Sequence, residues 1–422
     1  MSNDLLIKEL ANKARIASTT LRGSSIESRR AAIHSIAKAI ENNVSEILAA
    51  NNEDMNRERS AGLSESLLDR LELTEKRILG IVESNRKVAS LPDPLGRILK
   101  SGILPNGLKQ NLVTVPFGVV GMIYEARPNV TVDASVILLM SGNAALLRGS
   151  STARRSNEIL VQIMKSALAA TEISPEIIQL IPSDDRDTVR ALLHARGNVD
   201  LVIPRGSASL IRTVVDEALV PTIETGAGVC HVYVDKYADL EMAIPIIVNS
   251  KTHRPSVCNA AETLLVHSAI SDNFLPKALS ELSSRGVKLN CDLQSLEIAR
   301  KNGITANPAT SESWGTEYGT LEMNIAVVSD VDEAIEHIRT FGTQHTEAIV
   351  SENEPTIERF IAQSDCAAVM VNTSTRFTDG EEMGFGAEIG ISNQKLHARG
   401  PMGLEAMTTT TWIVRGEGQI RE

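Results

Sequence analysis

The chain has 422 residues, of which 42% are hydrophobic and 23% charged, as in ordinary globular proteins with sizeable cores. Its 42 basic and 53 acidic residues give a net charge of -11, which argues against non-specific binding to nucleic acid. No run of 18 apolar residues predicts a membrane span, and the N-terminus MSNDLLIKEL lacks the apolar core of a signal peptide. The 4 cysteines show no metal-ligand spacing, so we expect reduced thiols in the cytoplasm and no metal site.

Residues 1–90 carry the apolar spacing of helices. Ser24 and Glu27 have the spacing of a capping box before an amphipathic run over residues 31–49. A Pro- and Gly-containing break at residues 91–96 ends this pattern. Asn106 and Gly107 then separate two extended runs, which predicts a hairpin. An arm that reaches another subunit and a simple surface hairpin are equally good interpretations.

Residues 119–221 alternate between strand and helix patterns, which is typical of a doubly wound α/β domain. The expected strands are residues 119–124, 144–147, 177–181, 200–203 and 221–224. The expected helices are residues 131–140, 152–169, 186–194 and 208–218. Such a sheet favours nucleotide binding, although its first strand-to-helix turn, YEARPNVTVD, lacks the GxGxxG fingerprint.

Two other turns of this domain have the chemistry of anion binding. Arg148, Ser150 and Ser151 follow one expected strand, where a cation and hydroxyls suit a ribose or its phosphate. Gly206 and Ser207 open a helix after another strand, where N–H groups can hold a pyrophosphate. Ordinary helix capping explains either turn alone, but two such turns in one sheet favour binding.

Glu224 begins the segment Glu-Thr-Gly-Ala-Gly at the end of this domain. A carboxylate at a domain boundary suits proton handling, and a surface salt bridge is nearly as good an explanation. The glycines suit a hinge or a close approach of two backbones.

A second α/β pattern follows. The expected strands are residues 229–234, 263–266, 287–289, 324–328, 348–350 and 367–371, and the expected helices are residues 240–248, 274–282, 296–301, 331–340 and 356–362. The first helix leads into NSKTHRPSVCNAAETLLVH, which holds Cys258 in a loop before a strand. Lys251, His253 and Arg254 would stabilise its thiolate. A small buried cysteine is the alternative, but the polar loop and the following strand favour a reactive thiol.

Residues 372–403 are polar and glycine-rich, and we expect a functional loop. Its GFGAEIG run has one residue too many for GxGxxG, so we do not interpret it as a nucleotide fingerprint. Arg376, Lys395, His397 and Arg399 could bind an anionic substrate, whereas solvation explains most of them individually. The β-branched run MTTTTWIV, residues 407–414, predicts a strand that could pair across a subunit boundary.

These blocks together resemble the γ-glutamyl phosphate reductases, a family of the aldehyde dehydrogenase superfamily. The likeness runs from about residue 113 to the end, in VPFGVVGMIYEARPNVTVD, KTHRPSVCNAAETLLVH, GTQHTEAIV and NTSTRFTDGEEMGFGAEIGISNQKLHARGPMGLEAMTT. It implies an aldehyde-dehydrogenase-like α/β fold with a Rossmann-type dinucleotide-binding domain (1–100 and 115–228), a catalytic domain (229–404) and an oligomerisation arm (101–114 and 405–422). It also implies a homodimer or higher homo-oligomer, and it makes a contact with glutamate kinase a candidate interaction.

The resemblance assigns roles to particular residues. It implies that Cys258 is the nucleophile, that Asn129 stabilises the oxyanion and that Glu224 handles protons. The implied cofactor contacts are Arg148 and Ser150 at the adenosine ribose, Gly206 and Ser207 at the pyrophosphate, and Glu317 at the nicotinamide ribose. The candidate substrate-binding cations are Arg127, Arg254, Arg376 and Lys395, and the sequence does not separate those for phosphate from those for carboxylate.

One departure from the superfamily bears on the cofactor. Ordinary aldehyde dehydrogenases have Lys at the position of Arg148, and NAD-preferring members often carry an acid where this chain has Ser150 or Ser151. An Arg without a neighbouring acid can bind a 2′-phosphate with both arms of its guanidinium, so we expect NADP. The implied reaction is NADPH-dependent reduction of L-glutamyl 5-phosphate to L-glutamate 5-semialdehyde through a Cys258 thioester, the second step of proline biosynthesis from glutamate.

Two rivals remain at this point. A non-phosphorylating aldehyde dehydrogenase, which oxidises a small aldehyde to an acid, would share Cys258 and Asn129. A catalytically silent relative would bind only a nucleotide or a partner enzyme, and the intact Cys258, Asn129 and Glu224 argue against it.

Overall fold

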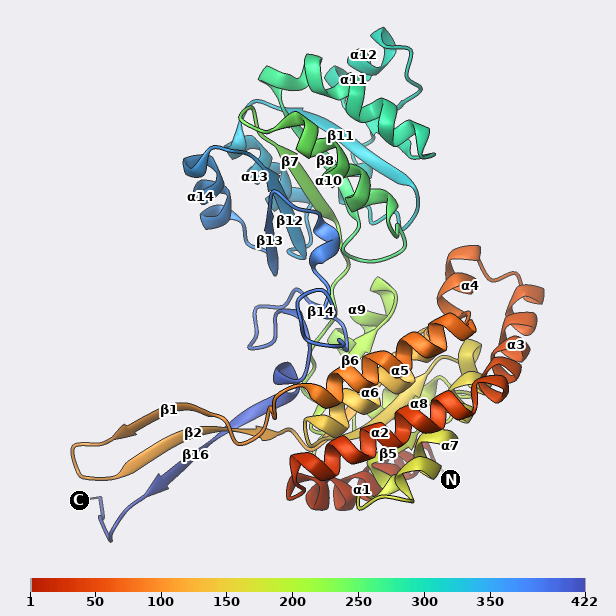
Figure 1. Cartoon of the computed structure of the whole chain (residues 1–422), viewed down its shortest axis with the longest axis vertical. Coiled ribbons are helices and arrows are strands. Elements are labelled where there is room, and N and C mark those ends of the chain that lie inside the picture. The colour runs from red at the N-terminus through yellow and green to blue at the C-terminus, as the bar shows by residue number, and fades with distance from the viewer. Residues whose placement is uncertain (1, 422) are drawn as a thin grey trace. The chain divides into compact units, whose positions relative to one another are not determined.

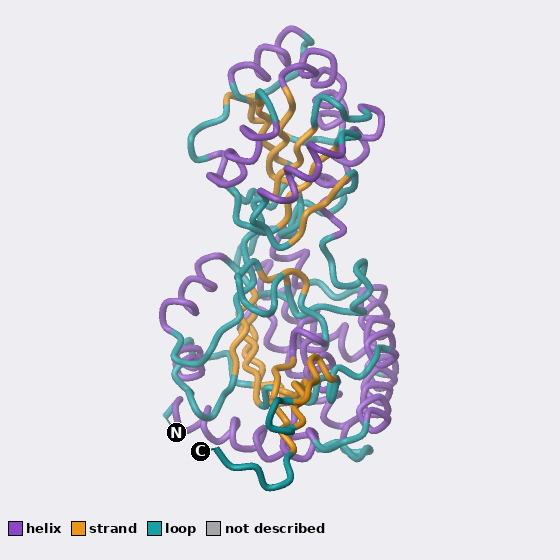
Figure 2. Tube along the Cα trace, turned by 90° about the vertical axis from the view of Figure 1, so that its left-hand side faces the viewer, coloured by secondary structure: helices purple, strands orange, loops and turns teal. Residues whose placement is uncertain are grey.

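The structure is a computed structural model that describes residues 2–421 of the chain. It divides into two compact units. Unit 1 is built from the segments that run up to Thr225, from Gly384 to Gly390 and from Leu396 onward, and unit 2 comprises Gly226–Met383 and Ile391–Lys395. In each unit helices flank the strands of the parallel sheet, as Figure 2 shows. Among the described residues, no helix combines the length and the apolar character of a membrane span.

Unit 1 begins with helices, as predicted, and Figure 1 shows them in red to orange. They are α1 (Asn3–Arg22), α2 (Ile26–Asn42), α3 (Val44–Ser60), α4 (Glu65–Leu71) and α5 (Glu75–Ser90). The predicted capping box is wrong, because Ser25 caps α2 by accepting from the Ser28 N–H at 3.1 Å. Ser24 instead donates to the Leu21 carbonyl, which the end of α1 leaves without a helical partner.

The sheet of unit 1 is parallel and confirms the doubly wound class. Its strands, in the order β5-β4-β3-β6, are β3 (Val119–Tyr124), β4 (Ala144–Gly149), β5 (Ile178–Leu180) and β6 (Leu201–Arg205). Between and after them lie α6 (Pro128–Met140), η1 (Ser151–Ala153), α7 (Arg154–Leu168), η2 (Pro175–Ile177), α8 (Asp187–Leu193) and α9 (Ala208–Glu217). Every residue of β3 and β4 is buried, as expected for strands covered on both faces.

The fifth strand predicted for this sheet, over residues 221–224, is wrong. Thr222 makes only an isolated bridge to Val202. The Pro221 carbonyl accepts from Val202, but proline has no N–H for a longer ladder. Gly226 and Gly228 follow directly and weaken strand pairing further.

A three-stranded antiparallel sheet, which we call the arm, also belongs to unit 1. It consists of β1 (Ile98–Ile103), β2 (Lys109–Pro116) and β16 (Thr408–Arg415), in the order β1-β2-β16. The predicted hairpin is confirmed, since β1 pairs with β2 and Gly107 in the turn has a φ of +84°. Figure 1 shows the arm extending from the helical part of unit 1. The predicted strand over residues 407–414 is present as β16, which pairs with β2 of its own chain.

Unit 2 contains a seven-stranded parallel sheet in the order β10-β9-β11-β8-β7-β12-β13. The strands are β7 (Cys230–Val234), β8 (Ala261–His267), β9 (Lys288–Cys291), β10 (Asn307–Pro308), β11 (Glu322–Val328), β12 (Thr346–Val350) and β13 (Ala368–Val371). The helices are α10 (Leu240–Thr252), α11 (Ser268–Ser284), α12 (Leu293–Lys301), α13 (Val331–Phe341) and α14 (Glu354–Gln363). Sequence patterns predicted all of these except β10, which has only 2 residues.

The glycine-rich segment 372–403 is mostly irregular, as predicted. Its regular pieces are η4 (Thr375–Phe377), β14 (Ile391–Ser392) and β15 (Gly400–Pro401). The remaining short elements are η3 (Ser313–Gly315) before β11 and η5 (Glu405–Met407) before β16.

Candidate active site

Cys258 lies in residues 253–260, between α10 and β8, and we call this segment the nucleophile loop. Its thiol is half-buried. Gly228 approaches the loop so closely that a Cβ on it would overlap the carbonyl group of Cys258. The close backbone approach inferred for the Gly-Ala-Gly segment is therefore found at Gly228, and glycine is required there.

Two tethers hold the backbone of the nucleophile loop. The Cys230 thiol donates to the Cys258 carbonyl at 3.2 Å. Burial raises the pKa of Cys230 well above its ordinary value, and the nearby Glu347 and Cys258 raise it further, so this thiol keeps its proton. On the other side, the buried Asn259 donates from its Nδ2 to the Thr378 carbonyl at 2.8 Å.

The two tethers are linked through β12. His345 Nδ1 lies 3.8 Å from the Cys230 sulfur and 2.9 Å from the Thr346 hydroxyl. The Thr346 hydroxyl in turn donates to the Thr378 hydroxyl at 3.0 Å. Burial lowers the pKa of His345 to about 4, so its ring is neutral at pH 7. A series of polar contacts thus runs from the Cys258 carbonyl to Asn259, and no sequence pattern predicted it.

The predicted cations near the thiol differ in environment. Lys251 is fully buried and pairs with Glu262, so its charge is compensated. His253 and Arg254 are exposed, and Arg376 Nε donates to His253 Nδ1 at 3.4 Å. Unit 2 therefore brings Arg376 to His253, the first residue of the nucleophile loop.

Two further predicted residues of unit 2 lie at its surface. Lys395 is exposed and forms an ion pair with Asp365. Glu317 is exposed and lies in the irregular segment between β10 and β11.

Of three predicted residues of unit 1, two lie at the start of α6 and the third lies in an irregular segment. Arg127 occupies the N-cap position of α6, with Pro128 in the first turn, where a missing N–H costs nothing. The half-buried Asn129 donates from Nδ2 to the Asp133 carboxylate at 3.0 Å, one helical turn on. Glu224 is half-buried in the irregular segment between α9 and β7.

Arg148, at the end of β4, is buried, and its guanidinium binds groups of its own unit. It donates to the carbonyls of Gly149 and Asp185, at 2.8 and 3.0 Å, and to the Thr188 hydroxyl at 3.2 Å. Burial lowers the pKa of Arg148, and Asp185 offsets part of this effect. The side chain therefore braces the loops beside β4, an environment that the sequence did not indicate.

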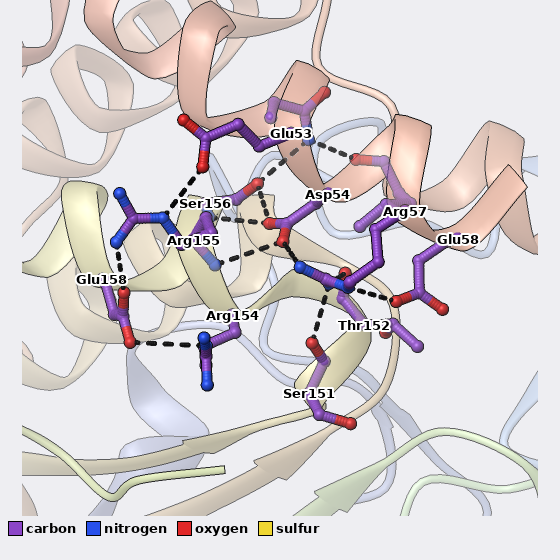
Figure 3. A network of polar contacts seen from close by, with 12 residues as sticks. Glu53, Asp54, Arg57, Glu58, Ser151, Thr152, Arg154, Arg155, Ser156 and Glu158 are labelled. Atoms are coloured by element: carbon purple, nitrogen blue, oxygen red, sulfur yellow. Dashed lines mark hydrogen bonds and ion pairs between the residues drawn. The ribbon is translucent and has the colours of Figure 1, made fainter. Parts of the chain in front are cut away.

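A polar network that sequence reasoning missed fixes the turn between β4 and α7 (Figure 3). Asp54 of α3 is buried and accepts from the Ser156 N–H and hydroxyl, both at 2.8 Å, so it caps α7 from another helix. Arg57 pairs with Asp54 at 2.8 Å and donates to the carbonyls of Ser151 and Thr152, at 3.0 and 2.8 Å. The N–H groups of Arg155 and Ser156, in the first turn of α7, thus donate to Asp54.

The start of α9 already holds a carboxylate. The Ser207 N–H donates to Glu125 at 2.6 Å and its hydroxyl to the same carboxylate at 3.2 Å. A Cβ on Gly206 would lie 2.5 Å from Glu125, so glycine admits this close approach. The Ser207 N–H and hydroxyl can therefore donate to an anion, as the predicted pyrophosphate contact requires.

A small hollow of about 120 Å³ lies beside the ends of β4 and β5 in unit 1. Gly149, Arg154, Asn157 and Asp184 are among the residues that line it. Among the described residues, no group of three or more His, Cys, Asp or Glu side chains could hold a metal ion.

Comparison with known proteins agrees with this architecture. The model of the aldehyde dehydrogenase family matches residues 2–294. γ-Glutamyl phosphate reductase of Thermobifida fusca is 50% identical over 415 residues, which cover 98% of each chain. The crystal structure of γ-glutamyl phosphate reductase from Thermotoga maritima has a TM-score of 0.93 at 45% identity and covers 99% of this chain and 100% of that chain.

A more distant structure shows the fold alone. An acetylating aldehyde dehydrogenase from Geobacillus thermoglucosidasius has a TM-score of 0.72 at 16% identity, covering 100% of this chain and 99% of that one. The chain therefore belongs to the aldehyde dehydrogenase family and, within it, to the γ-glutamyl phosphate reductases. The predicted fold class is confirmed, and the family uses a nicotinamide cofactor.

Proposed function

We propose that this chain catalyses the NADPH-dependent reduction of L-glutamyl 5-phosphate to L-glutamate 5-semialdehyde and phosphate, the second step of proline biosynthesis from glutamate. The observation that supports it most is the 50% identity, over 98% of the chain, to a γ-glutamyl phosphate reductase. The half-buried Cys258 thiol, on a loop tethered at both sides, supplies the nucleophile. Reduced thiols fit a cytoplasmic location.

The first step forms a covalent intermediate on the protein. The Cys258 sulfur attacks the acyl carbon, the bond from that carbon to the phosphate oxygen breaks, and phosphate leaves with the electron pair. The Asn129 amide and the Cys258 N–H are the proposed oxyanion donors, and one such donor is worth about 10²–10³ in kcat. An amide has two N–H bonds, so Asn129 keeps one donor beyond its contact with Asp133.

The residues that would hold the cofactor fit its chemistry. The Ser207 N–H and hydroxyl already donate to the Glu125 carboxylate beside Gly206, and a pyrophosphate bound there would replace that carboxylate. Arg148 and Ser150 are the proposed contacts of the adenosine ribose and its 2′-phosphate, and the Arg148 guanidinium would have to exchange contacts with the Gly149 and Asp185 carbonyls to reach that phosphate. Glu317 is exposed and available to a ribose hydroxyl. When bound, NADPH would supply the hydride that reduces the acyl group on Cys258 to the oxidation level of an aldehyde.

The chain's remaining roles concern protons and substrate charge. Glu224 is the proposed proton carrier when the thiolate is regenerated. Arg127, Arg254, Arg376 and Lys395 are the proposed cations for the substrate phosphate and carboxylate. Lys395 must exchange its partner Asp365 for substrate if it takes this role.

The arm is the proposed site of homo-oligomerisation. Leu99, Ile103, Trp412 and Val414 are large apolar residues of the arm that are exposed in one chain. Apolar faces and the edge strand β16 are suited to a second copy of the chain. Light scattering would measure the mass, and Trp412→Lys should lower it to that of a monomer.

A contact with a glutamate kinase is a separate proposal, which co-sedimentation would test.

The deciding experiment follows NADP reduction by glutamate 5-semialdehyde with and without inorganic phosphate. We expect the rate to depend on phosphate, because phosphate must release the acyl group from Cys258. A phosphate-independent rate would instead indicate a non-phosphorylating aldehyde dehydrogenase. Cys258→Ala should abolish turnover while leaving the dissociation constant for NADPH unchanged, and active Cys258→Ala protein would rule out the covalent route.

A further inference from the structure

We propose that Lys251 and Glu262 are a positioning pair, which holds the nucleophile loop in place and fixes it to the segment that carries Glu317. The Lys251 ammonium lies 2.5 Å from the Glu262 carboxylate, and both side chains have 0% exposure. Lys251 is in the last turn of α10, and Glu262 is the second residue of β8. The pair is 11 residues apart in the chain and therefore closes the base of the loop that presents Cys258.

Glu262 has a second contact that extends this role. Its other carboxylate oxygen accepts from the Gly319 N–H at 3.4 Å. Gly319 has a φ of +61° and lies two residues after Glu317, in the irregular segment before β11. One carboxylate thus binds both the end of α10 and the Glu317 segment. This part of the inference rests on the proposed function, in which Glu317 holds the nicotinamide ribose.

The electrostatics indicate that the Lys251–Glu262 pair contributes more to the geometry of the nucleophile loop than to the free energy of unfolding. Burial lowers the pKa of Lys251 and raises the pKa of Glu262 to about 7, because each charge has lost its hydration. A buried ion pair can often be replaced by apolar residues without loss of stability. Its directional bonds, in contrast, specify one arrangement of the segments that it joins.

The position of the pair matches the other tethers of the loop. Cys230 holds the Cys258 carbonyl, and Asn259 holds Thr378. These contacts fix the middle of the loop, while Lys251 and Glu262 fix its two ends. Without the pair, we expect the Cys258 thiol to sample more orientations, because both ends of the loop lose their directional partner.

The test compares the double variant Lys251→Met/Glu262→Leu with the single variant Glu262→Gln. The matched control is Lys277→Met/Glu241→Leu, which removes an exposed Lys–Glu pair of the same unit, 2.6 Å apart. All variants are made with Cys366→Ser, because the half-buried Cys366 would otherwise compete for reagent. The readouts are Tm, the second-order rate of Cys258 alkylation by iodoacetamide, located by mass spectrometry, and kcat and KM.

For the double variant we expect a Tm close to the parent's, an alkylation rate changed about tenfold or more, and a kcat at least about tenfold lower. KM for NADPH should rise, because the Glu317 segment loses its tie to Glu262. Glu262→Gln keeps one acceptor oxygen, which can serve Lys251 or Gly319 but not both, and should have a smaller effect on KM than the double variant. The control pair should match the parent in all readouts.

A double variant with the parent's Tm, alkylation rate and kcat would overturn the proposal. If the double variant does not fold, Glu262→Gln decides, and an unchanged alkylation rate and kcat would count against positioning. Alkylation uses neither substrate nor cofactor. It therefore reports on the pair even if the phosphate-dependent assay shows no activity and the proposed function fails.

Discussion

Replacing Gly228 with alanine tests how tightly the nucleophile loop is held. The added Cβ would overlap the carbonyl group of Cys258 and would lie 2.8 Å from its Cα. Carbon atoms in contact prefer about 3.5–4.0 Å, so the Cys258 carbonyl carbon, 2.4 Å from the added Cβ, must move by at least about 1 Å, and the carbonyl oxygen, at 1.5 Å, must move further. A misplacement of that size at a reacting group costs about 10²-fold in rate. We therefore expect kcat for Gly228→Ala to fall about 10²-fold.

The assay is phosphate-dependent NADP reduction, with iodoacetamide alkylation of Cys258 as a second measure. The matched control is Gly315→Ala, because a Cβ at Gly315 in unit 2 meets nothing within 4 Å. NADPH affinity of Gly228→Ala should stay near the parent value, since the proposed pyrophosphate and adenosine contacts are in unit 1. A Gly228→Ala protein with the kcat and alkylation rate of Gly315→Ala would refute the reasoning.

Three further predictions follow from buried or charged groups. Burial and the nearby His231 lower the pKa of His337 to about 3, so on acidification the unfolded chain binds this proton first and the free energy of unfolding falls below about pH 6.5. His337→Phe should abolish about 2 kcal/mol of the loss between pH 7 and pH 5, measured by urea unfolding. An unchanged loss would contradict this prediction. Asp54→Ala should destabilise unit 1 by about 2–3 kcal/mol, because the start of α7 loses its cap. The control Glu53→Ala removes only an exposed ion pair and should cost less than about 1 kcal/mol in the same urea assay. Equal losses for the two variants would contradict the capping role of Asp54. Glu125→Gln should lower KM for NADPH about threefold or more, because the carboxylate competes with pyrophosphate for the Ser207 N–H and repels it, and a raised KM would show that Glu125 assists binding instead.

Local sequence signals predicted the elements that depend on local chemistry. The Asn106-Gly107 turn supplies the positive φ that a hairpin needs, and the arm is found there. The placement of Cys258 in a loop between a helix and a strand followed from the same kind of pattern. The strand expected over residues 221–224 is absent, because Pro221 has no N–H to donate to a ladder. A hydrophobic pattern alone carries no information on such missing donors.

Contacts between distant residues could not be predicted in this way. Asp54 and Ser156 are 102 residues apart, and nothing near either residue indicates that one caps the helix of the other. Arg148 was visible as a cation at a strand end, but its bond to Asp185 depends on how β4 and α8 pack. Only the folded chain shows that Glu125 reaches Ser207, because the two lie at the ends of neighbouring strands.

The interleaving of the two units has a consequence for how the protein is made. Unit 2 is nearly continuous, from Gly226 to Met383, whereas unit 1 needs β16 from the far end of the chain. During synthesis one edge of β2 therefore stays unpaired until about 300 further residues have been translated. At ordinary ribosomal speeds this takes roughly 15–60 s. In that interval the free edge of β2 is open to pairing with other nascent chains.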